Sequence, residues 1–153
     1  QRESWRCFNC PYWAGGRGSL TIPDPTAVVL TGEVQRGEAG DVYQGFACSP
    51  GRTGKSVEGV VRVIDNLTKE AKSVRHGDIL VARFTSPAWT PLFSLVCGII
   101  LEEGGMLSHG AVVARECGIP AVSQLCGATR VLKNGDVVRM HGVTGVVEVL
   151  ATV

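Results

Sequence analysis

Apolar residues in the later part of the chain fall into short runs that are bounded by glycine, proline and charged residues. Residues 79–82 and 98–101 contain no polar side chain, and short runs of this kind between turn-forming residues predict buried strands. A third run alternates, which predicts a strand that has Val57, Val61 and Val63 on one face. These runs indicate a fold built on a buried sheet.

Two helices are expected between the strands. Ser108 stands directly before residues 109–117 and can cap a helix over that range, and Gly118 is suited to end it. Pro91 is suited to the first turn of a shorter helix that ends at about Val96. Strands that alternate with short helices place the chain in the mixed α/β class.

Further strands are expected at residues 120–122, 137–140 and 143–150, with an Asn-Gly-Asp turn of the hairpin type before the second of them. Residues 45–51 read Gly-Phe-Ala-Cys-Ser-Pro-Gly, a composition typical of a turn, and they follow a polar, glycine-rich stretch. One more short strand is expected at residues 27–30.

Residues 1–26 differ from the rest of the chain, because they are rich in glycine, proline, arginine and aromatic residues and show no apolar periodicity. We expect them to be a linker or the tail of a preceding domain, and residues 27–153 to be a single domain. A chain of 153 residues is long enough for one such core. Because it begins with Gln1 rather than methionine, we expect it to be part of a longer protein.

Composition argues against several classes of partner. The formal net charge is +1 and no basic run occurs, which disfavours nucleic acid and anionic membrane surfaces. The longest nearly apolar run, residues 92–101, is about half as long as a membrane span. The N-terminus also lacks the apolar core of a signal peptide. The expectation is a cytoplasmic protein.

Cysteine spacing bears on metal and redox chemistry. Of the six cysteines only Cys7 and Cys10 form a close pair, whereas a zinc site needs four ligands. We therefore expect no metal site, and reduced thiols suit the cytoplasm. A small metal-binding or redox module that uses Cys7 and Cys10 stays open as an alternative.

The most informative segment is residues 102–122, EEGGMLSHGAVVARECGIPAV, in which a glycine pair and a serine lead to a histidine at a helix start. This order suits a histidine that accepts a phosphoryl group, because neutral imidazole is nucleophilic. A ring at a helix start also lies near unpaired backbone N–H groups and the positive end of the helix dipole, which favour phosphate. His109 is thus the candidate catalytic residue, although a structural histidine cap would fit the same spacing.

Four neighbours of His109 would shape the phosphate pocket. Gly104 and Gly105 let the backbone approach an anion without obstruction by a side chain. Gly110 keeps the first helical turn free of bulk, and Ser108 can either donate a hydrogen bond to the phosphate or cap the helix.

Residues 104–122 resemble the signature of the mobile domain of the phosphoenolpyruvate-utilising enzymes, a family that includes phosphoenolpyruvate synthase, pyruvate phosphate dikinase and rifampicin phosphotransferase. The resemblance covers the glycine pair, the serine and histidine, the Ala-Arg-Glu helix end and Gly-Ile-Pro-Ala-Val. It extends over about residues 44–150, including Trp-Thr-Pro-Leu-Phe at residues 89–93 and the closing His141-Gly142. Ser-His-Gly and the closing His-Gly look more like the rifampicin phosphotransferase branch.

The resemblance implies a swivelling β/β/α phosphohistidine domain, with mixed sheets and short helices packed on them. In such enzymes an ATP-grasp domain binds ATP and Mg²⁺, a second domain binds the acceptor, and the histidine domain moves between them on the same polypeptide. Nε2 of His109 would accept the β-phosphoryl group of ATP, with release of AMP and phosphate, and pass it to a pyruvate-like or other small-molecule acceptor. The chain would be part of a dikinase-type phosphotransferase and inactive when isolated.

Arg115 and Glu116 are expected to support this site rather than to react. Arg115 lies nearly two helical turns after His109 and would brace the helix or dock a partner domain. Glu116 would pair with Arg115 or remain solvated. His76 and His141 have no ligand or base nearby in the sequence and are expected to be structural.

A non-catalytic scaffold that keeps the fold is the main alternative to a carrier, and the intact His109 with its glycines speaks against it. Residues 51–56, GRTGKS, end like a nucleotide-binding loop, but their first glycine is too close for the phosphate-binding pattern. We therefore expect no nucleotide site within the domain.

Overall fold

The structure, a computed structural model, describes residues 39–125 and 127–152. These residues form an eight-stranded sheet in the order β1-β8-β7-β3-β4-β5-β6-β2, with short helices packed on it. The strands are β1 Val42–Gln44, β2 Phe46–Pro50, β3 Val57–Val63, β4 Ile79–Ala82, β5 Gly98–Leu101, β6 Pro120–Ser123, β7 Val137–Met140 and β8 Val146–Ala151. The helices are α1 Leu67–Glu70, α2 His109–Cys117 and α3 Ala128–Val131, with 3₁₀ helices η1 Ala71–Ser73 and η2 Pro87–Ser94.

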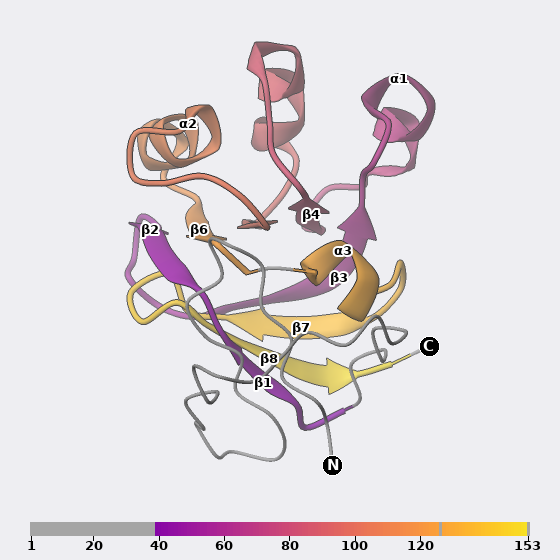
Figure 1. The fold of residues 1–153 in the computed structure, drawn as a ribbon, viewed down its shortest axis with the longest axis vertical. Coiled ribbons are helices and arrows are strands. Elements are labelled where there is room, and N and C mark those ends of the chain that lie inside the picture. Colours follow the sequence, from indigo (N-terminus) through magenta and orange to yellow (C-terminus); the bar gives the residue numbers. More distant parts are fainter. Residues whose placement is uncertain (1–38, 126, 153) are drawn as a thin grey trace, which may run out of the picture.

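The sheet folds over at β3 and so forms two layers. Residues 57–60 of β3 pair with β7 in antiparallel fashion, whereas residues 61–63 pair with β4 in parallel. The layer of β4, β5 and β6 is covered on its outer face by α1, α2 and η2, and the layer of β7, β8 and β1 lies beneath it (Figure 1). This arrangement confirms the predicted β/β/α architecture.

Two hydrophobic cores explain why the central strands are apolar throughout. Leu80 and Ile99 face the helices, in the first core, while Ile79 and Ile100 face the second sheet layer. Because successive side chains of a strand point to opposite faces, a strand between two cores has no position left for a polar residue. Full burial of each such aliphatic side chain contributes about 1.5–3 kcal/mol.

The expectation of a turn at residues 45–51 is wrong, because β2 occupies Phe46–Pro50, and β1 forms in the stretch before it. Both are edge strands: β2 pairs with β6 and β1 with β8. Edge strands are stabilised by backbone hydrogen bonds to one neighbour, so they tolerate the polar residues and the proline that suggested a turn.

Other boundaries also differ from expectation. The helix expected to start at Pro91 is a 3₁₀ helix that starts at Pro87. The strand β8 starts at Val146, since the N–H of Gly145 bonds to the carbonyl of His141 and closes a turn. The Asn-Gly-Asp turn joins α3 to β7 rather than two strands. The expected helix at residues 109–117 is confirmed as α2.

Several expectations lie outside the described residues. These are the linker at residues 1–26, the strand at residues 27–30, and the chemistry considered for Cys7 and Cys10. In the part of the chain that the structure describes, no helix has the length and hydropathy needed to cross a bilayer.

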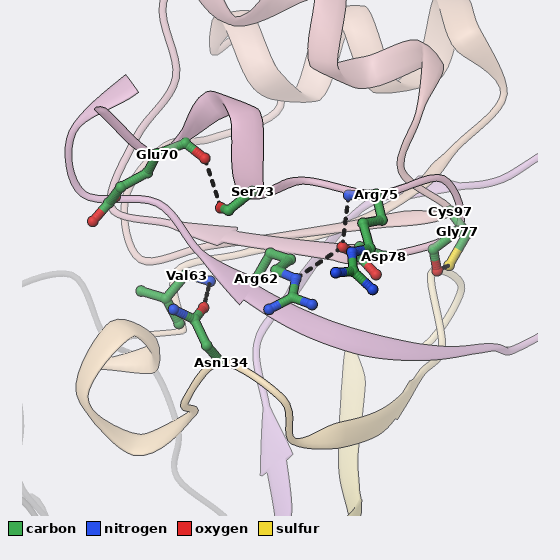
Figure 2. A network of polar contacts seen from close by, with 9 residues as sticks. All are labelled: Arg62, Val63, Glu70, Ser73, Arg75, Gly77, Asp78, Cys97 and Asn134. Atoms are coloured by element: carbon green, nitrogen blue, oxygen red, sulfur yellow. Dashed lines mark hydrogen bonds and ion pairs between the residues drawn. The ribbon is translucent and has the colours of Figure 1, made fainter. Parts of the chain in front are cut away.

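A buried carboxylate ties the turn before β4 to β3. Oδ2 of Asp78 accepts hydrogen bonds from Nε of Arg62, at 3.0 Å, and from the backbone N–H of Arg75, at 2.8 Å (Figure 2). The thiol of Cys97 donates to the carbonyl of Gly77 in the same turn, at 3.1 Å. These contacts fix the edge of the sheet at which β4 and β5 begin.

We expect Asp78→Ala to lower the free energy of unfolding by about 2 kcal/mol, because it leaves a half-buried guanidinium and a backbone N–H without their acceptor. Urea unfolding followed by circular dichroism measures the loss. Glu58→Ala is the matched control, since it removes a carboxylate bonded to Arg139 on the exposed face of the sheet, where an ion pair contributes little. Equal losses in the two variants would contradict this account of Asp78.

Candidate functional site

The site lies at the edge of the sheet where the parallel strands end. Ala82 of β4 pairs with Leu101 of β5, so the loops that follow both strands leave the sheet side by side. The N–H of Glu103 bonds to the carbonyl of Arg83 at 2.9 Å and extends this pairing beyond the strands. One loop leads to η2 and the other to α2.

His109 is the first residue of α2, and both of its ring nitrogens face hydroxyl groups. Nδ1 lies 3.1 Å from Oγ1 of Thr85, in the loop after β4, and Nε2 lies 3.5 Å from Oγ1 of Thr90 in η2. The ring is half-buried, and its centroid lies 5.9 Å from that of Phe93. The imidazole is therefore half-buried, with a threonine hydroxyl near each ring nitrogen.

The contact with Thr85 bears on which ring nitrogen can react. A threonine hydroxyl can accept a hydrogen bond from Nδ1–H, and in that tautomer Nε2 of His109 carries the lone pair. Thr90, the neighbour of Nε2, is exposed, and its 3.5 Å distance is at the limit of a hydrogen bond. Of the two contacts, the one at Nε2 is the longer and involves the more exposed threonine.

Ser108 occupies the N-cap position of α2 but does not cap it with its side chain. Its hydroxyl donates instead to the carbonyl of Gly105, at 2.8 Å, so the predicted side-chain cap is wrong. The first N–H groups of a helix have no partner within the helix, and in α2 two of them belong to the buried residues Gly110 and Ala111. The use of the Ser108 hydroxyl toward phosphate remains a prediction.

Two of the predicted glycines stand where a side chain would be strained, Gly104 through its backbone conformation and Gly110 through contacts with neighbouring side chains. Gly104 has φ of 114°, and a Cβ there would lie 2.9 Å from Oγ of Ser108. A Cβ on Gly110 would lie 2.7 Å from Cδ1 of Leu101 and 2.8 Å from Oγ1 of Thr85, so glycine here lets Thr85 reach the ring. A Cβ on Gly105 would meet no atom within 4 Å, so the structure does not require glycine at this position.

Arg115 braces the segment before the helix. Its Nη1 donates to the carbonyl of Cys48 in β2 at 3.1 Å, and its Nη2 donates to the carbonyl of Met106. The guanidinium thus connects α2 with an edge strand and with the loop after β5, in line with the expected bracing role. Glu116 is exposed.

Buried hydrogen bonds to β6 also hold the loop between β5 and α2. The hydroxyl of Ser123, in β6, donates to the carbonyl of Gly104 at 3.1 Å and lies 2.8 Å from Sγ of Cys48. Burial raises the pKa of the Cys48 thiol, which keeps it protonated and able to donate to Ser123. The loop between β5 and α2 is therefore held at Gly104 by β6 and at Met106 by Arg115, which also bonds to β2.

The other two histidines lie away from this edge. His76 is exposed in the turn before β4, and His141 follows β7, with its Nε2 3.6 Å from Oε1 of Glu148.

Thr85 and Thr90 were not foreseen as partners of His109, since they lie 24 and 19 residues before it in the chain. The sequence signal that could have identified these threonines is their position after the buried strand β4. The carboxyl ends of neighbouring parallel strands lie at the same edge of a sheet, so the loops that follow such strands lie close together. Within residues 39–125 and 127–152, no three His, Cys, Asp or Glu side chains are grouped so that they could hold a metal ion.

The chain is similar in sequence to known proteins. Residues 74–145 match the family described as "PEP-utilising enzyme, mobile domain". A rifampicin phosphotransferase of Bacillus cereus is 50% identical over 94 residues, which are 61% of this chain and 11% of the relative. One of Bacillus subtilis is 42% identical over 135 residues, 84% of this chain and 15% of the relative. A probable phosphoenolpyruvate synthase of Staphylothermus marinus is 42% identical over 115 residues, 74% and 13% of the two chains.

The chain thus spans less than a sixth of the length of these relatives. Among solved structures, the aconitase X of Thermococcus kodakaraensis is similar in fold alone, with a TM-score of 0.53 and 20% identity over 72% of this chain and 99% of that chain. The sequence match and the shared signature lead to one assignment: residues 74–145 belong to the mobile-domain family of the PEP-utilising enzymes.

Proposed function

We propose that this chain is the phosphoryl-carrier domain of a multidomain, ATP-dependent, dikinase-type phosphotransferase, and that His109 carries the phosphoryl group. The observation that carries the proposal is the 3.1 Å contact between Nδ1 of His109 and the hydroxyl of Thr85 at the start of α2. It holds the ring at Nδ1, and a phosphoryl donor would approach Nε2, whose contact with Thr90 is longer.

In the proposed first step a bond forms between Nε2 of His109 and the β-phosphorus of ATP. The bond from that phosphorus to the oxygen it shares with the α-phosphoryl group breaks, and AMP leaves. Water takes the γ-phosphoryl group as inorganic phosphate, so the histidine retains one phosphoryl group. In the second step an acceptor oxygen attacks this phosphorus, the P–N bond breaks, and the imidazole returns to its neutral form.

The surroundings of His109 suit the charge that arrives with the phosphoryl group. The positive end of the α2 dipole favours an anion at this position. Gly105 has no side chain and no atom within 4 Å of where a Cβ would lie, so phosphate oxygens can come close to its backbone, and Ser108 and Gly110 are the neighbours of His109 in the chain. We assign the phosphate pocket to these residues together with Gly104.

The pocket is held in place before any phosphate arrives. Ser123 fixes the carbonyl of Gly104 and Arg115 fixes that of Met106, on either side of Gly105. A loop that already has its bound geometry does not need to be reorganised during the transfer, and preorganised donors are the main source of electrostatic catalysis. Ser123 and Arg115 are therefore positioning residues.

The donor and acceptor sites would lie on other parts of the same polypeptide. This chain spans 11–15% of the length of the rifampicin phosphotransferases that it resembles, so companion domains are consistent with its size. We assign the binding of ATP and Mg²⁺ to an ATP-grasp domain, and that of the small-molecule acceptor to another. We expect the whole protein to work in the cytoplasm, and residues 27–153 to be its carrier domain.

The direct test is labelling of the full-length protein with ATP that carries ³²P at the β-position. We expect label that is stable to alkali and labile to acid, as phosphohistidine is, and we expect His109→Ala to lose it completely. The histidine variants His76→Ala and His141→Ala serve as controls and should retain wild-type labelling. Persistence of the label in His109→Ala would refute the assignment.

A second test distinguishes a role of Ser123 in positioning the loop before α2 from a role in the stability of the fold. Ser123→Ala should slow phosphorylation of the full-length protein about tenfold, because a mobile loop loses preorganisation equivalent to about 1.4 kcal/mol. Ser49→Ala is the matched control: Ser49 is 1% exposed, Ser123 is 0% exposed, and the hydroxyl of Ser49 bonds to the carbonyl of Ile119, just beyond the far end of α2.

Both serine variants should lose similar stability, about 1 kcal/mol, in urea unfolding. Only Ser123→Ala should lose phosphorylation rate, and Ser123→Thr, which keeps the hydroxyl, should recover part of it. If Ser49→Ala slows phosphorylation as much as Ser123→Ala does, the role of Ser123 is structural alone.

A further inference from the structure

The hydroxyl of Thr90 faces the ring nitrogen at which the proposed function places the phosphoryl group. Its Oγ1 lies 3.5 Å from Nε2 of His109, whereas Oγ1 of Thr85 lies 3.1 Å from Nδ1. The Thr90 contact is at the limit of a hydrogen bond, so this hydroxyl binds the bare nitrogen only weakly. Hydrogen bonds of catalytic groups are often long in the free protein and shorten when the reacting group is present. The oxygens of a phosphoryl group on Nε2 would come within reach of Thr90.

The backbone that carries Thr90 is anchored on both sides. Trp89, directly before it, is 8% exposed, and Phe93, one turn later in η2, is 1% exposed. The N–H of Trp89 bonds to the carbonyl of Ser86 at 2.9 Å, and the ring of Phe93 packs 5.9 Å from that of His109. The Thr90 hydroxyl is thus presented from a fixed helix, and a donor fixed in advance needs no reorganisation during transfer.

The other hydroxyl groups near the ring already have partners. The hydroxyl of Ser108 donates to the carbonyl of Gly105 at 2.8 Å, and that of Thr85 contacts Nδ1 of His109. Within the residues that the structure describes, the long contact to Nε2 is the one hydrogen bond of the Thr90 hydroxyl. This hydroxyl can therefore turn to a new acceptor without breaking a contact that holds the fold.

Cationic side chains on the loops around the site are held elsewhere. Arg83 lies 3.3 Å from a carboxylate oxygen of Glu103, and Arg115 donates to the carbonyls of Cys48 and Met106. In the described part of the chain, the side chain that faces Nε2 is therefore a neutral donor. A neutral hydrogen bond is roughly half as strong as one from a charged group. A moderate bond suits a carrier, because a group that is held too tightly is passed on slowly.

We infer that Thr90 is a second catalytic residue, whose hydroxyl donates a hydrogen bond to a non-bridging oxygen of the phosphoryl group as that group moves onto Nε2 of His109. This inference rests on the proposed function. The bond that forms joins Nε2 to phosphorus, and the bond that breaks joins phosphorus to the leaving group of the donor. The Thr90 hydroxyl keeps its proton throughout. Its hydrogen rotates about the C–O bond, so Thr90 can turn from Nε2 to the phosphoryl oxygen without a backbone shift.

The test uses two phosphoryl donors on the full-length protein. ATP labelled with ³²P at the β-position reacts through a companion domain, whereas phosphoramidate is a small reagent that transfers its phosphoryl group to imidazole directly. Thr90→Val keeps the shape of the side chain and removes the donor, so it should slow phosphorylation of His109 about tenfold with both reagents. Thr90→Ser, which retains a hydroxyl, should keep most of the wild-type rate.

The matched control is Ser94→Ala, in the same 3₁₀ helix. Ser94 is exposed, as Thr90 is, and its hydroxyl donates to the carbonyl of Pro91 at 2.9 Å. This variant removes a hydroxyl from η2 without touching the ring, so it should be phosphorylated at the wild-type rate. A second readout is the tautomer of His109: because Thr85 contacts Nδ1, Thr90→Val should leave the proton on that nitrogen.

The possible outcomes separate this inference from the proposed function. Absence of label from ATP in the wild-type protein would count against the proposed function itself. Wild-type rates in Thr90→Val would overturn only the role of Thr90. Slowing with ATP alone would also overturn that role, because Thr90 would then act through a companion domain rather than on the phosphoryl group. The same holds for a proton that moves to Nε2 in Thr90→Val, since Thr90 would then orient the ring.

Discussion

The parallel pairing of β4 with β5 is the constraint on which the site depends. It sends the two following loops from the same edge of the sheet, one with Thr85 and the other leading to His109. Residues that are 24 positions apart in the sequence thereby meet at 3.1 Å. Gly110 completes the arrangement, because any side chain at that position would collide with Leu101 and Thr85. The orientation of the imidazole thus depends on the pairing of β4 with β5 and on the absence of a side chain at position 110.

The sequence predicted the parts of the fold that carry strong local signals. β4 and β5 followed from continuous apolar runs between turn-forming residues, and the bounds of α2 followed from the serine before it and the glycine that ends it. The edge strand β2 was not foreseen, because its stability comes from pairing with β6, which local composition does not reveal. For the same reason the histidine was found from its motif, whereas its partner Thr85 emerged only from the tertiary structure.

Rigid and exposed features are combined within one loop. Ser123 and Arg115 fix the segment between β5 and α2 from opposite sides, while Leu107 between them projects into solvent. A carrier needs both properties, since the phosphoryl group must be received in a defined geometry and the surface around it must make and break contacts. The remote ion pair of Asp78 with Arg62 serves only the stability of the sheet from which the loop arises.

The central claim is that Thr85 orients His109 so that Nε2 reacts. Long-range ¹H–¹⁵N NMR of the imidazole, recorded on the full-length protein before and after treatment with phosphoramidate, tests it in one experiment. The account predicts a proton on Nδ1 in the free protein and a phosphoryl group on Nε2 of His109 in the treated protein. A proton on Nε2 in the free protein, or a phosphoryl group on Nδ1 after treatment, would contradict it.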